Sequence, residues 1–109
     1  MNVRLYVWQR LTAAIMLPLV LVHVAMIFYA TRAGMSAADI LGRTRSSIGW
    51  AAFYTLFVVA AAIHAGIGLR NVFAEWSPVG DRAAAMLAVV FGFLLLLLGL
   101  RAVAAVVLA

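Results

Sequence analysis

The chain has 109 residues, of which 69% are hydrophobic and 10% charged, and its mean hydropathy is +1.19. Soluble domains are usually about half apolar and about a quarter charged, so this composition indicates a membrane protein, with residues 1–109 as one membrane domain. The net charge of +5 comes from arginines at the ends of apolar runs, which favours lipid or cofactor contacts over nucleic acid, and the absence of cysteine excludes disulfides and iron–sulfur clusters.

Three apolar segments, at about 5–30, 48–73 and 82–108, predict an all-α membrane protein with three transmembrane helices in up-down-up order. Each exceeds the ~20 residues that cross a bilayer. Pro18 is expected to bend the first segment. The polar connection 31–47 predicts a short helix that starts at Ser36. The turn at 77–81 predicts an antiparallel hairpin of the second and third helices, with Asp81 able to cap the third.

The arginines divide evenly between the two ends of such a bundle. One end carries Arg4, Arg10, Arg70 and Arg82, and the other carries Arg32, Arg43, Arg45 and Arg101. The positive-inside rule therefore does not decide the orientation, although the amino terminus tips it slightly toward the inside. In that orientation the turn at 77–81 faces the cytoplasm and the connection 31–47 faces the periplasm.

Two residues of the first segment are candidates for function. Arg10, beside Gln9 and Thr12, is either a snorkelling anchor or a contact to a cofactor propionate or a quinone. His23 lies 13 residues further on, ~20 Å deeper on an ideal helix, among bulky side chains. A packed, hydrogen-bonded histidine is its expected role, and a ligand to a second, distal haem is the alternative.

His64 is the main candidate, because an ionisable side chain within a membrane span is costly and marks a functional or a paired structural group. Its neighbours at three and four positions are mostly small, namely Ala60, Ala61, Ile67 and Gly68. A flat group with a metal, such as a b-type haem, could lie against this face. A hydrogen bond to a neighbouring helix is the alternative role.

Glu75 and Trp76 end the second segment. An acid beside an aromatic residue at the interface is most often a solvated charge and an anchor. These two residues could also form the mouth of a site for an amphipathic redox lipid, since a quinone needs an apolar slot with a few hydrogen-bonding groups.

Two motifs then resemble a known family. Gln9-Arg10-Leu11-Thr12-Ala13 resembles an "R-x-T-A" entry to the first span, and Ile63-His64-Ala65-Gly66-Ile67-Gly68 resembles an "H-A-x-x-G" motif in the second. Together with Glu75-Trp76 and a third apolar helix, they are similar to the membrane-anchor subunits of succinate dehydrogenase and fumarate reductase, the D-type cytochrome b anchor above all.

The resemblance implies a role for each of these residues. His64 would be an axial ligand of haem b, with the second ligand from a C-type anchor subunit, and Arg10 would approach the haem propionates. An acid–tyrosine pair borders the ubiquinone pocket in the family; here it reads Glu75-Trp76, and tryptophan offers a single donor. Some relatives use histidines on both helices for two haems and others have none, so the number of haems stays open.

The sequence therefore predicts a subunit of a succinate:quinone oxidoreductase in the bacterial cytoplasmic membrane. It would dock the iron–sulfur and flavoprotein subunits, pack against the second anchor, and line a site for ubiquinone or menaquinone. Alone it would not be an enzyme. The alternative is a non-redox scaffold or transporter component in which His23 and His64 only pair helices.

Overall fold

The computed structural model describes residues 3–108, which form four helices: α1 (Val3–Arg32), α2 (Ala37–Thr44), α3 (Ile48–Trp76) and α4 (Asp81–Val107). Three of them, α1, α3 and α4, are long and apolar enough to cross a membrane, with 30, 29 and 27 residues. This confirms the predicted all-α membrane fold, and α2 is the short helix expected in the first connection. The observed ends lie within three residues of the predicted ones.

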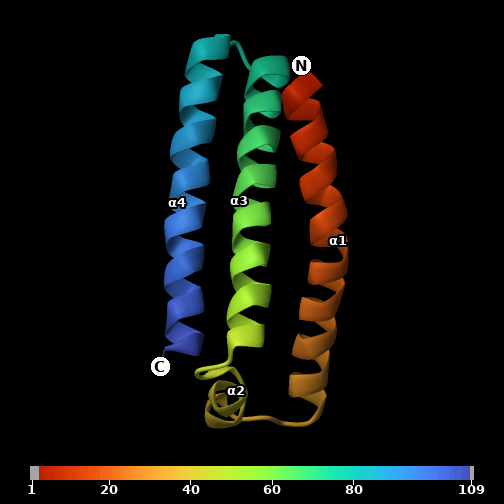
Figure 1. Cartoon of the computed structure of the whole chain (residues 1–109). Coiled ribbons are helices and arrows are strands. Elements are labelled where there is room, and N and C mark those ends of the chain that lie inside the picture. Colours follow the sequence, from red (N-terminus) through yellow and green to blue (C-terminus); the bar gives the residue numbers. More distant parts are fainter. Residues whose placement is uncertain (1–2, 109) are drawn as a thin grey trace.

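The three long helices lie side by side in a row with α3 in the middle (Figure 1). Successive long helices run in opposite directions, so the start of α1 lies at the same end as the turn between α3 and α4. α2 lies at the opposite end, below the start of α3 (Figure 1). The molecule is elongated, with principal extents of 48 × 23 × 22 Å.

Small residues bring α3 and α4 together. A Cβ added to Gly66 would lie 3.5 Å from the Ala88 carbonyl oxygen, and one added to Gly92 would lie 3.6 Å from the Ala62 carbonyl oxygen. Backbones approach this closely only where side chains are absent or minimal, as is usual between helices in a bilayer. Among the described residues, the buried apolar side chains are accordingly small: Ala60, Ala62, Ala84, Ala88 and Val107.

The start of α2 is held by a reciprocal pair of hydrogen bonds. The Asp39 backbone N–H donates to the Ser36 hydroxyl (3.2 Å), and the Ser36 backbone N–H donates to the Asp39 carboxylate (2.9 Å). This capping box satisfies N–H groups that have no partner inside the helix. The Ser36 backbone bond, with help from its hydroxyl, holds the pKa of Asp39 below its ordinary value.

The last residue of α2 and the residues that follow it cover the end of α4. The Thr44 hydroxyl donates to the Val106 carbonyl at 2.7 Å, and Thr44 is only 4% exposed. The Ser46 N–H donates to the Val107 carbonyl at 2.7 Å from a backbone with a positive φ of 56°. The last carbonyls of a helix have no partner within it, so these two bonds supply what α4 lacks there.

The start of α4 differs from expectation. Gly80 is its N-cap and makes no side-chain hydrogen bond, whereas Asp81 is the first helical residue. The prediction that Asp81 caps the helix was wrong. Its carboxylate lies in the first turn instead, where negative charge is favoured by the helix dipole.

Candidate cofactor-binding site

His64 lies past the middle of α3 and faces α1. Its Nδ1 atom is 3.2 Å from the Thr12 hydroxyl oxygen. Thr12 is 2% exposed, so this polar contact is closed off between the two helices. Nε2 of His64 makes no hydrogen bond within residues 3–108, and it is not fully buried there. One ring nitrogen is therefore used inside the chain, and the other is open to a group from outside it.

The Thr12 side chain is held by the preceding turn of α1, which contains Trp8 and Gln9. Its hydroxyl lies 2.8 Å from the Trp8 carbonyl oxygen and 3.1 Å from that of Gln9. Such bonds to the preceding turn are common for threonine within helices. They fix the side-chain rotamer, and with it the position of the oxygen that meets His64.

The small residues beside His64 border the contact between α1 and α3. Ala60 is 4% exposed, and a Cβ on Gly68 would lie 3.4 Å from the Gln9 amide nitrogen. The missing side chain of Gly68 thus lets α1 approach α3. Ala61 and Ile67 line two different cavities, so the four neighbours do not form one continuous face for a flat group. A cofactor on His64 would have to lie to one side of the α1–α3 contact.

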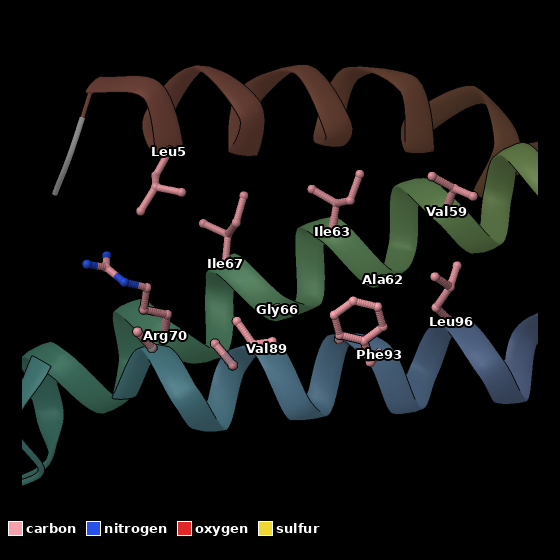
Figure 2. Close-up of a pocket in the computed structure, with 13 residues that line it drawn as sticks. Leu5, Val59, Ala62, Ile63, Gly66, Ile67, Arg70, Val89, Phe93 and Leu96 are labelled. Carbon is pink, nitrogen blue, oxygen red and sulfur yellow. The ribbon is translucent and has the colours of Figure 1, made fainter. Parts of the chain in front are cut away.

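A groove of about 540 Å³ runs between α3 and α4 and is lined almost wholly by apolar residues. Figure 2 shows Arg70 at one end of this groove, with Leu5 of α1 nearby and Phe93 further along. The lining does not include His64. Arg70 thus lies at the edge of an apolar groove, six residues or ~9 Å along α3 from the imidazole of His64.

Arg10 lies on α1 between the two points at which α1 meets the His64 turn, since Gln9 contacts Gly68 and Thr12 bonds His64. It is exposed, and its guanidinium carbon is 5.6 Å from the centre of the Tyr6 ring. Arg10 is thus nearer to the level of His64 than to the end of α3. Its side chain is available to an anionic group at that level.

Glu75 and Trp76 lie at the end of α3, and both are exposed, Trp76 to 83%. The antiparallel pairing puts Arg10 opposite the turn between His64 and Gly68. Trp76 is eight residues beyond Gly68, ~12 Å along the helix. Within this chain, Arg10 and the Glu75-Trp76 pair are therefore at the same end of the bundle but at different depths.

His23 belongs to a separate cluster at a deeper level. Its ring meets Tyr54 and Phe57 edge-on, with centroids 6.0 and 5.4 Å away, and its Nδ1 is buried without a hydrogen-bond partner. It lies 11 residues beyond Thr12 on α1, ~16 Å along the axis. The prediction that the two imidazoles lie at different depths is confirmed. Within residues 3–108, no three His, Cys, Asp or Glu side chains gather as a metal site.

Sequence reasoning placed Thr12 in a polar patch with Arg10 but did not pair it with His64. The position of Thr12 in α1 does not predict this pairing, because the sequence does not say which turn of α3 lies opposite Thr12. Thr44 was missed altogether. It sits in a polar connection, and its acceptor is 62 residues away.

The fold defines a small multi-pass helical membrane protein with a polar contact between its first two spans. The model of one family, the succinate dehydrogenase/fumarate reductase transmembrane subunit, matches residues 1–106, and the chain belongs to this family. Members associate with other subunits of that complex, so the chain is a membrane anchor and not a small transporter component. No curated protein and no solved structure matches the chain significantly.

Proposed function

We propose that this chain is the D-type anchor of a succinate:quinone oxidoreductase and that His64 binds haem b together with a ligand from a C-type anchor. The observation that carries the proposal is the state of the His64 ring: Nδ1 is bonded to Thr12, while Nε2 has no partner within residues 3–108. A ring that served only to join helices would leave its second nitrogen without a partner in the membrane, which costs free energy.

The open nitrogen of His64 fits the ligand chemistry of a haem. An imidazole nitrogen is a suitable ligand for haem iron, and this chain offers one at this depth. Bound there, haem would supply one-electron transfer. Arg10 and Arg70 lie toward one end of the bundle from His64, where they could pair with propionates. The apolar residues of α1 and α3 would keep water from the ring. The second axial ligand would come from the partner anchor.

We assign the quinone contact to the end of α3. Glu75 and Trp76 are exposed, as residues completing a pocket with other subunits would be in a single chain. An acid and an indole N–H can both hydrogen-bond a quinone head group, while Trp76 adds ring area. The iron–sulfur and flavoprotein subunits would dock at this end, on the cytoplasmic side of a bacterial inner membrane.

The decisive experiment is removal of the imidazole in the intact complex. His64→Ala should abolish the b-type absorbance in a reduced-minus-oxidised spectrum, because this chain has no other histidine at that depth to replace the lost ligand. The matched control is His23→Ala, which removes the other histidine of the chain and should leave the haem on His64 in place. Haem content, measured chemically against flavin, gives the stoichiometry. An unchanged haem content in His64→Ala would refute the assignment.

A further inference from the structure

The Thr12 hydroxyl has three polar atoms around it and only one proton to donate. Its oxygen lies 2.8 Å from the Trp8 carbonyl, 3.1 Å from the Gln9 carbonyl and 3.2 Å from Nδ1 of His64. Carbonyl oxygens accept and never donate. The 2.8 Å separation is that of an ordinary O–H···O bond. The proton therefore belongs to the bond with Trp8, and toward His64 the hydroxyl has only lone pairs to offer.

The imidazole must then be the donor in the contact between His64 and Thr12. A neutral imidazole carries its proton on one nitrogen and a lone pair on the other. Donation from Nδ1–H fixes the proton there and leaves the lone pair on Nε2. That is the nitrogen without a hydrogen bond in residues 3–108. The contact thus selects the tautomer that a metal ligand at Nε2 requires.

We propose that Thr12 is a positioning residue for the cofactor, holding the His64 ring in the Nδ1–H tautomer with Nε2 ready to bind iron. This inference rests on the proposed function and adds to it a role for a residue of α1. Thr12 is buried to 2% exposure, so no water competes for its oxygen. Outer partners of a metal-bound histidine fix ring orientation and raise ligand basicity in this way.

The proposal predicts opposite results for two substitutions. Thr12→Val keeps the shape of the side chain but removes the acceptor, whereas Thr12→Ser keeps the hydroxyl. In the intact complex, Thr12→Val should weaken haem binding by about 10- to 100-fold, the range found for such outer partners. Any haem retained should have a raised midpoint potential, because a less basic imidazole favours the ferric state less. Thr12→Ser should restore both properties toward wild type.

The matched control is Thr55→Val, the same change at an exposed position of α3. It should alter neither haem content nor potential. A purely structural role of Thr12 would lower the amount of assembled complex without moving the potential of the haem that remains. An unchanged potential and haem content in Thr12→Val would overturn the proposal.

A second readout needs no haem. In complex assembled without haem, nitrogen-15 NMR of labelled histidine distinguishes an Nδ1–H from an Nε2–H ring. The His64 signal is the one that is lost in the spectrum of His64→Ala. The expected state is Nδ1–H in wild type and a loss of that preference in Thr12→Val. An Nε2–H ring in wild type would refute the Thr12 role. Haem retained in His64→Ala would instead refute the proposed function.

Discussion

At the scale of single residues, the His64–Thr12 contact is too weak to explain a histidine in the membrane. Hydrogen bonds between membrane helices average ~0.6 kcal/mol and rarely exceed ~1.7 kcal/mol. A polar group left unsatisfied in hydrocarbon costs several kcal/mol. The bond to Thr12 satisfies one ring nitrogen of two. The proposed ligand at Nε2 would satisfy the other nitrogen, which helix pairing alone leaves without a partner.

Trp76 provides a prediction at this scale. Its proposed quinone contact combines ring area with one indole donor. Trp76→Phe removes only the donor and should lower kcat/KM for quinone by about fivefold, the equivalent of a net hydrogen bond of ~1 kcal/mol. Trp76→Ala removes the ring as well and should lower it further. Steady-state quinone reduction by the intact complex measures both effects.

The control for these variants is electron transfer that bypasses the quinone. Succinate oxidation with an artificial acceptor should proceed at the wild-type rate in Trp76→Phe and Trp76→Ala. Haem content should not change, since Trp76 is 12 residues or ~18 Å beyond His64. Wild-type quinone kinetics in both Trp76→Ala and Glu75→Ala would mean that other subunits build the pocket.

At the scale of helices, α3 and α4 pack closely because glycines at their contact carry no side chain. The tightest point is Gly99, where an added Cβ would lie 2.5 and 2.9 Å from the two methyl carbons of Val58. Because both methyl groups and the Val58 Cβ are close, rotation of the valine does not remove the overlap. The helices would have to move apart at this level to admit any larger residue.

Gly99→Ala should therefore destabilise the hairpin by about 1–3 kcal/mol, the usual effect of overpacking. The gain in helix propensity from alanine, about 1 kcal/mol, works against this effect. Val58→Ala in the same chain should recover most of the loss, because it removes both methyl groups. Thermal unfolding of the purified complex in detergent compares the stability of the wild type, Gly99→Ala and the double variant with Val58→Ala.

Gly42→Ala is the matched control, since a Cβ at this helical position of α2 meets nothing within 4 Å. It should be neutral or slightly stabilising. A destabilisation equal to that of Gly99→Ala would show that the close approach to Val58 is not the cause.

The helices themselves could be predicted from sequence, but which face of each helix packs against its neighbour could not. Length and apolar composition suffice for three spans, and Ser36 with Asp39 marks the start of α2. By contrast, α3 is apolar and small-sided on several faces, so nothing local says which face meets α1. Gly68 was therefore assigned to a cofactor face, whereas its missing side chain makes room for Gln9 of α1. The Thr12–His64 pair could not be predicted for the same reason, since it forms only when this face of α3 packs against α1.

At the scale of the whole molecule, a row of three helices leaves most large apolar side chains uncovered. The exposed ones include Leu17, Phe28, Val90, Phe93 and Leu97, from α1 and α4. In a bilayer such surfaces face lipid or other helices, so this chain alone has room for a partner along its length. By their positions in the helices, the arginines lie toward the two ends of the bundle in two groups of four, as expected.

Labelling tests which end faces the cytoplasm. The chain has no cysteine, so single variants are unambiguous. Ser77→Cys, in the turn before α4, should react with an impermeant maleimide only after the membrane is opened. Ser46→Cys should react from the outside in intact cells. Ala38→Cys, exposed on α2, is a second probe for the same side as Ser46. Reaction of Ser77→Cys alone from the outside would reverse the orientation.

The bonds from Thr44 and Ser46 to the end of α4 bear on the order of assembly during synthesis. Thr44 leaves the ribosome 62 residues ahead of its acceptor, Val106. The loop thus reaches the membrane surface well before the carbonyls that it will cover exist. It can close over them only when α3 and α4 have both entered the bilayer as a hairpin. Until then, the Thr44 hydroxyl can donate to the Ile40 carbonyl of its own helix, 3.3 Å away, whereas water or lipid head groups must satisfy the Ser46 N–H. This corner of the protein is accordingly the last to be completed as the nascent chain matures.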